Sequence, residues 1–111
     1  MGANQDPTVT PRIRHIVMWK VNGTTAGERA AHAERVKGEL ESMRGRIPGL
    51  LALEVGIDLS GVDYACDVVL CSEFASQAAL DAYADHPEHV RVKRALHDLR
   101  ASRHQVDYAV G

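Results

Sequence analysis

The chain has 111 residues, of which 45% are apolar and 25% are charged, and its formal net charge is -2. This composition is typical of one globular domain with a single hydrophobic core, and the length leaves no room for a second. The small net charge excludes general attraction to nucleic acid or to an acidic membrane surface, so we expect partners to be recognised by shape. No run of about 18 apolar residues is present, and no membrane-spanning helix is predicted.

The first ten residues are polar and show no hydrophobic period, which predicts a flexible N-terminal arm ahead of a domain over residues 11–111. The opening MGANQDPTVT lacks the basic start and the apolar stretch of a secretion signal. We therefore expect a cytoplasmic protein.

A first strand is predicted over residues 13–21, because side chains alternate between two faces there. One face carries Ile13, His15, Val17, Trp19 and Val21, and the other carries Arg14, Ile16, Met18 and Lys20. Both faces include apolar side chains. The sequence thus predicts a strand that is covered on both sides.

An amphipathic helix is predicted next. Thr25 and Glu28 have the spacing of a capping box, in which a hydroxyl and a carboxylate bind free amides at a helix start. Apolar residues then recur at steps of three and four as far as Ile47, and Pro48-Gly49 ends the pattern.

The middle of the chain predicts two strands joined by a turn at Ser60-Gly61. Residues 51–59 alternate apolar with small or acidic side chains, and residues 63–74 alternate with apolar groups on both faces. Cys66 and Cys71 would point to opposite faces of this second strand. They cannot form a disulfide with each other in that arrangement, and we expect both to fill apolar space.

Two short helices and a last strand complete the pattern. Ser76 is predicted to cap a helix that ends at Ala84, and Asp85 or His86 to cap a second helix that begins at Pro87. The last strand is predicted over residues 104–110.

The resulting order, β-α-β-β-α-β, predicts an α+β domain of the ferredoxin-like type with a four-stranded antiparallel sheet. Helices on one face would leave the other face open, where Ile16, Met18, Val69 and Cys71 would meet water. This is more apolar surface than a monomer normally exposes, so a homodimer is predicted.

The densest group of reactive side chains lies at the predicted kink between the two short helices, in residues 81–90. His89 and Tyr83 are candidate catalytic residues, a base and a phenolic partner for an enclosed ligand. The alternative is structural, with Asp85 or His86 acting as a cap and His89 packing against its neighbours.

His15 and Trp19 share the strand face that the helices are predicted to cover. His15 is either a core histidine bonded to a backbone carbonyl or a polar group that lines a cavity. The predicted ligand-binding residues are therefore His15, Trp19, Tyr83, His86 and His89. No recognised metal-ligand spacing or phosphate-binding glycine loop is present, and no metal or cofactor is predicted.

Four segments together resemble the stress-responsive dimeric α/β-barrel (Dabb) domain family. They are RHIVMWKV at 14–21, IPGL at 47–50, DVVLCSEF at 67–74 and YADHPEHV at 83–90. The most specific of them is H-P-x-H-V at 86–90, after a strand that ends in S-E-F. The resemblance covers nearly all of residues 12–110 and implies a ferredoxin-like subunit whose sheet closes into a dimeric α/β barrel with that of a second copy.

Within the family, the pattern is similar to olivetolic acid cyclase, a plant polyketide cyclase that performs an aldol condensation without a cofactor. By this likeness its catalytic tyrosine and histidine fall on Tyr83 and His89, and its first-strand histidine falls on His15. A further active-site histidine falls on Val68 here, which makes the enclosed site less polar.

Three hypotheses follow. The first is a stress-response-type dimeric barrel that binds a small apolar or aromatic molecule between sheet and helices. The second is a cofactor-independent enzyme, either a cyclase of the aldol type or a small monooxygenase. The third is a dimer with a purely structural role. Ligand identity and pathway are not encoded in any motif of the sequence.

Overall fold

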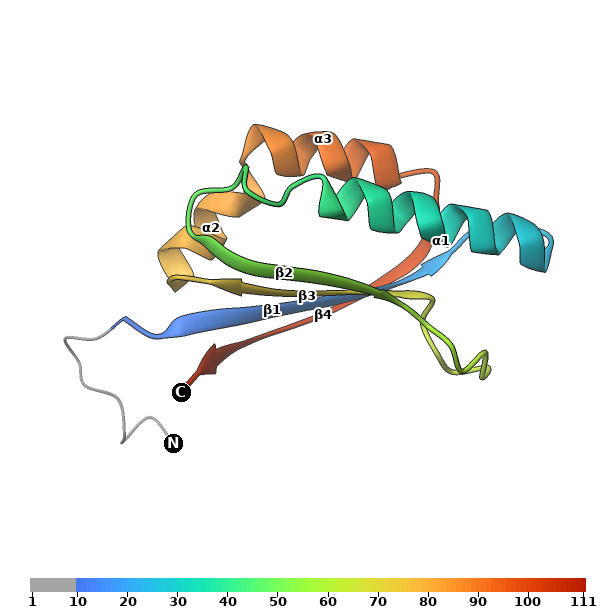
Figure 1. The fold of residues 1–111 in the computed structure, drawn as a ribbon, viewed down its shortest axis with the longest axis horizontal. Helices are drawn as coiled ribbons and strands as arrows, with labels where there is room; N and C mark the ends of the chain where they lie inside the picture. Colours follow the sequence, from blue (N-terminus) through green and yellow to red (C-terminus); the bar gives the residue numbers. More distant parts are fainter. Residues whose placement is uncertain (1–9) are drawn as a thin grey trace.

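The fold, in a computed structural model that describes residues 10–111, consists of four strands and three helices (Figure 1). In chain order they are β1 (Arg12–Val21), α1 (Ala26–Glu41), β2 (Leu50–Ile57), β3 (Val68–Phe74), α2 (Gln77–Ala84), α3 (Pro87–Leu96) and β4 (Arg100–Val110). The arm predicted over residues 1–10 lies outside the described residues except for its last position.

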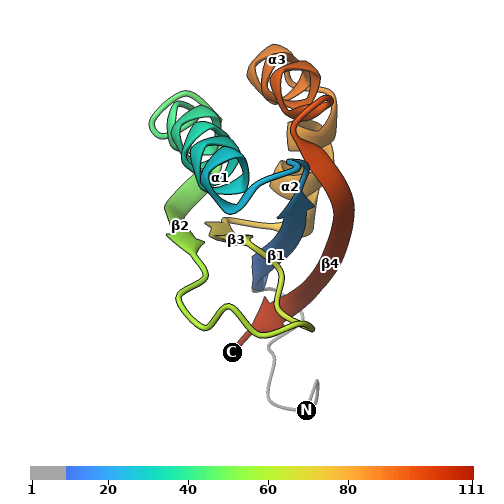
Figure 2. The same cartoon turned by 90° about the vertical axis from the view of Figure 1, so that its right-hand side faces the viewer.

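The strands form one antiparallel sheet in the order β2-β3-β1-β4. Figure 2 shows the helices on one face of this sheet and no helix on the other. The predicted ferredoxin-like β-α-β-β-α-β fold is confirmed, with the second helical segment divided into α2 and α3. No helix in the described part of the chain is long and apolar enough to cross a membrane.

The start of α1 follows the predicted capping box. The Glu28 amide donates to Thr25 Oγ1 at 3.0 Å, and Glu28 Oε1 accepts from the Thr24 amide at 3.1 Å. The helix ends at Glu41, six residues before the predicted end, because turns replace helical hydrogen bonding after that point. Met43 and Ile47 remain buried in those turns, which explains why the apolar period continues past the helix.

The core lies between the sheet and the helices. Val17, Leu70 and Phe74 from β1 and β3 are each almost completely buried there. The helices contribute Val36 and Leu40 from α1, Leu80 and Tyr83 from α2, and Val92 and Leu96 from α3. The face of β1 predicted to be covered is therefore the buried face, and it includes His15, which is 4% exposed.

Three strand boundaries differ from the prediction by two residues or more. β2 ends at Ile57, two residues early, and β4 begins at Arg100, four residues early. β3 begins at Val68 rather than Asp63, because the chain turns before it, where the Ala65 amide donates to the Val62 carbonyl at 3.1 Å. Cys66 thus lies outside β3. Both cysteines are free and partly buried, and Cys71 lies on the open face of the sheet.

The open face of the sheet carries apolar side chains. Met18 is 39% exposed, Val106 54% and Tyr108 44%, while Ile16, Val69 and Cys71 are half-buried. The two predicted faces of β1 are therefore both found, and β4 adds Val106 and Tyr108 to the open one. At one corner Glu73 forms ion pairs with Arg12 and Arg14.

Candidate functional site

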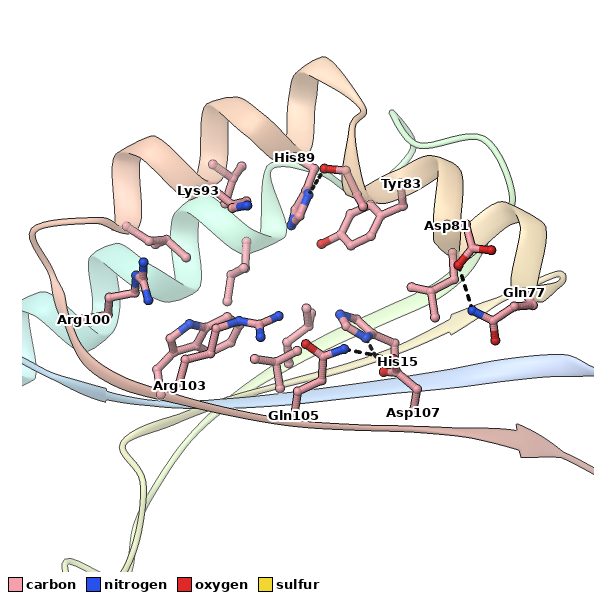
Figure 3. A pocket seen from close by; sticks show the side chains of 18 residues that line it. His15, Gln77, Asp81, Tyr83, His89, Lys93, Arg100, Arg103, Gln105 and Asp107 are labelled. Carbon is pink, nitrogen blue, oxygen red and sulfur yellow. Dashed lines mark hydrogen bonds and ion pairs between the residues drawn. The ribbon is translucent and has the colours of Figure 1, made fainter.

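A cavity of about 470 Å³ lies between the sheet and the helices α2 and α3 (Figure 3). Its apolar wall is formed by Val17, Trp19, Leu40, Leu70, Leu80, Ala84, Val92 and Leu96. Its polar wall is formed by His15, Gln77, Asp81, Tyr83, His89, Lys93, Arg100, Arg103, Gln105 and Asp107. This size and mixture are typical of a site for a small organic molecule.

His15 enters the cavity from β1 and is held by a carboxylate from β4. His15 and Asp107 are paired in the sheet, and His15 Nδ1 lies 2.5 Å from Asp107 Oδ1. Gln105 donates from Nε2 to the other carboxylate oxygen at 2.9 Å. Because the carboxylate accepts a hydrogen bond from Nδ1, the proton of a neutral His15 ring resides on Nδ1, and Nε2 keeps its lone pair.

Tyr83 and His89 form a second pair, which the break between α2 and α3 brings together. Their ring centroids are 4.1 Å apart, and the Tyr83 ring is also 5.9 Å from the ring of His15. His89 Nδ1 lies 3.0 Å from the Ala84 carbonyl and therefore donates to it. This bond fixes the His89 tautomer, so its Nε2 is available to accept a proton.

The surroundings keep this pair neutral near pH 7. Burial raises the pKa of Tyr83 to about 12, against a smaller opposing effect of Arg103. Burial also lowers the pKa of His89, and the charges of Lys93, His15 and Arg103 act in the same direction, while the bond to Ala84 opposes them. Tyr83 is thus a hydroxyl donor and His89 an imidazole acceptor.

The Tyr83 hydroxyl has little to bind within the protein. Its hydrogen bond among residues 10–111 is to the sulfur of Met43 at 3.8 Å, and a thioether is a weak acceptor. Tyr83 is nevertheless buried, with only 5% of its surface exposed. A ligand with an oxygen atom in the cavity would satisfy this hydroxyl better than Met43 does.

Four of the five predicted ligand-binding residues line the cavity: His15, Trp19, Tyr83 and His89. His86 does not line it. Its Nδ1 accepts a hydrogen bond from the Glu88 amide at 3.1 Å, and it caps α3 with Pro87 in the first turn. The structure thus gives His86 the capping role that the sequence offered as the alternative.

Seven polar residues of the cavity were missed: Gln77 and Asp81 on α2, Lys93 on α3, and Arg100, Arg103, Gln105 and Asp107 on β4. The β4 residues face the cavity because Arg103, Gln105 and Asp107 pair with Trp19, Val17 and His15. Their spacing of two was visible in the sequence and was the available signal. The face that these residues take depends on the register in which β4 pairs with β1, and a local sequence pattern does not contain that register.

No three or more of the histidine, cysteine and acidic side chains within residues 10–111 come together as a possible metal site.

A ferredoxin-like domain with a partly open cavity between its sheet and its helices is the class that this geometry defines. The family described as the stress responsive A/B barrel domain, Dabb, matches residues 13–110. The chain belongs to this family, as the four sequence segments indicated.

Solved structures agree with this assignment. A dimeric ferredoxin-like protein of unknown function from Bacteroides fragilis is 28% identical, with a TM-score of 0.78 over 89% of this chain and 96% of that one. A Dabb family protein from Mesorhizobium loti is 24% identical, with a TM-score of 0.73 over 92% and 99% of the two chains. The search of curated proteins gave no match.

Two enzymes share the fold at lower identity. The hydroxynitrile lyase of Passiflora edulis is 15% identical with a TM-score of 0.68, and it covers 91% of this chain and 94% of its own. The cofactor-independent oxygenase SnoaB of Streptomyces nogalater is 15% identical with a TM-score of 0.70, over 92% and 95%. At this identity the likeness concerns the fold alone.

Proposed function

We propose that the protein binds a small, mostly apolar or aromatic molecule in the cavity between the sheet and the helices. The observation that carries the proposal is that one cavity reaches His15, Tyr83 and His89 at once. Ordinary packing would leave no space beside these rings, whereas a cavity of about 470 Å³ accommodates a ligand of drug-like size.

We also propose that the protein forms a homodimer. Support comes from the open face of the sheet, where Met18, Val106 and Tyr108 would be removed from water by a second sheet. The similar protein from Bacteroides fragilis is itself described as dimeric.

Binding can be tested with 4-phenylbutanamide, a neutral probe with an apolar ring and one polar group. We expect its addition to shift the backbone amide resonances of His15, Tyr83 and His89. Ala84→Phe places a ring at the cavity wall and should weaken this binding, whereas Ala82→Phe, at an exposed position of the same helix outside the cavity, should not. Equal effects of the two substitutions would contradict binding in the cavity.

A cofactor-independent enzyme is the second candidate, and the paired rings of Tyr83 and His89 favour it. Two proteins of the same fold are enzymes, a hydroxynitrile lyase and a cofactor-independent oxygenase, which is consistent with this candidate. The sequence resemblance to olivetolic acid cyclase favours an aldol-type reaction, and the oxygenase gives the monooxygenase alternative. A neutral His89 can take a proton from carbon beside a substrate carbonyl, and the Tyr83 hydroxyl can donate to the carbonyl oxygen as negative charge develops there.

Proton abstraction can be measured without the natural substrate. In D₂O, hydrogen beside the carbonyl of 4-phenyl-2-butanone is replaced by deuterium when a base catalyses enolisation, and proton NMR follows the loss of signal. We expect the protein to accelerate this exchange and His89→Ala to abolish the acceleration. Binding of the ketone without any acceleration would reject the enzyme and leave the binding protein in place.

A further inference from the structure

One end of the cavity is cationic. Figure 3 shows Lys93, Arg100 and Arg103 at this end, while Gln77, Asp81 and Asp107 lie at the other. Arg103 and Asp107 are four positions apart on β4, a separation of about 13 Å along a strand. The charge of the cavity therefore changes along its length.

Among residues 10–111 the three cations have no ion-pair partner. Within this range no side-chain hydrogen bond or salt bridge is formed by Lys93, Arg100 or Arg103. By contrast, four arginines outside the cavity, Arg12, Arg14, Arg46 and Arg91, form ion pairs with glutamates. The cavity thus gathers positive charges that residues 10–111 do not neutralise.

The acidic residues of the cavity are already engaged. Asp107 accepts from His15 and Gln105, and Asp81 accepts from Gln77 at 2.9 Å. Neither carboxylate is bonded to a cation at the other end. No carboxylate among residues 10–111 therefore neutralises Lys93, Arg100 and Arg103, and a bound anion could do so.

The elements that position these cations also contact the reactive pair. On α3, Lys93 follows His89 by one helical turn and lies on the same face, and on β4, Arg103 is paired with Trp19. The charges of Lys93 and Arg103 both lower the pKa of His89. A group bound by these cations would be held beside the Tyr83 and His89 rings.

We propose that the ligand of the cavity is an anionic molecule, an aryl or alkyl carboxylate whose carboxylate group binds to Lys93, Arg100 and Arg103. Its apolar part lies along Trp19, Val92 and Leu96 toward Tyr83 and His89. This inference rests on the proposed binding function and specifies its ligand class. The three cations are exposed, so the carboxylate binds at the mouth of the cavity and keeps some of its water.

The test compares two probes of nearly the same size and shape, the anionic 4-phenylbutyrate and the neutral 4-phenylbutanamide. Calorimetric titration of the full chain should show about tenfold tighter binding of the carboxylate, since charge-assisted hydrogen bonds are stronger than neutral ones. Arg103→Gln and Lys93→Gln should each weaken the carboxylate severalfold and leave the amide unchanged. Added salt should weaken only the carboxylate.

Arg94→Gln is the matched control. It removes one positive charge from the same helix at a position outside this cavity, and it should leave the preference for the carboxylate intact. If the two probes bind with equal affinity and Ala84→Phe weakens the binding of both, the proposal of an anionic ligand is wrong and the proposal of a binding cavity is retained. Failure of both probes to bind would contradict the binding function as well.

Discussion

His15 and Asp107 are separated by 92 positions in the sequence and lie directly opposite each other on β1 and β4. Their side chains meet inside the cavity, with Nδ1 and Oδ1 2.5 Å apart. The imidazole is almost fully buried, whereas the carboxylate is 30% exposed. The pair therefore orients a buried ring from a partly solvated anchor, and it joins the edge strand β4 to the core.

Loss of the anchor should destabilise the fold. Asp107→Ala leaves the buried Nδ1 of His15 without its acceptor, which costs about 1–3 kcal/mol of unfolding free energy. Asp107→Asn keeps an acceptor oxygen and should cost less. Urea unfolding at neutral pH measures both, with Glu34→Ala, at an exposed position of α1, as a control within about 0.5 kcal/mol of wild type. Equal stability of Asp107→Ala and Glu34→Ala would show that the pair contributes nothing to the fold.

Tyr83 should make the fold sensitive to alkali. Its pKa is 10.0 when unperturbed and about 12 in the folded chain. Above pH 10 the unfolded tyrosine ionises while the folded one keeps its proton, so stability is complete below pH 10 and is lost as the pH rises toward 12. We expect this loss to be on the order of 2 kcal/mol and to be absent from Tyr83→Phe.

The measurement is the difference in unfolding free energy between wild type and Tyr83→Phe as a function of pH. At neutral pH the difference should be small, because the hydroxyl is bonded to the Met43 sulfur alone among the described residues. A difference that stays constant from neutral to strongly alkaline pH would contradict a buried, neutral phenol.

The local patterns of the sequence predicted much of this fold. The alternation in β1 placed His15 and Trp19 on the covered face, and the Thr25 and Glu28 spacing located the start of α1. Both features depend on neighbouring residues only, so a local pattern contains them. The order of the elements along the chain and the family were predicted in the same way.

The polar half of the cavity could not be predicted so directly. Asp107 and Arg103 reach the site only because β4 pairs with β1 in one register, and register depends on contacts between distant parts of the chain. The predicted start of β3 was also wrong. Asp67 continues the alternation of the strand, yet its carboxylate accepts a hydrogen bond from the Val21 amide on β1, a contact between distant parts of the chain.

His89 should make the fold sensitive to acid. Burial, together with nearby positive charges, lowers its pKa below the ordinary 6.5. The unfolded chain then binds a proton that the folded chain does not, so this contribution to stability is complete above pH 6.5 and falls as the pH decreases through the folded pKa. His89→Gln should unfold with a shallower dependence on acid. Parallel curves for the two proteins would indicate a solvated, ordinary imidazole.

The open sheet face should determine the oligomeric state. Val106 is 54% exposed in the single chain and lies among Ile16, Met18 and Tyr108 on the face opposite the helices. A carboxylate buried there without a partner costs several kcal/mol, so Val106→Glu should convert a dimer to a monomer in light scattering at micromolar concentration. Ala31→Glu, at an exposed position of α1, provides a control for added charge and should remain dimeric. A stable, folded wild-type monomer under the same conditions would mean that this face is stable when exposed to solvent and that the dimer proposal is wrong.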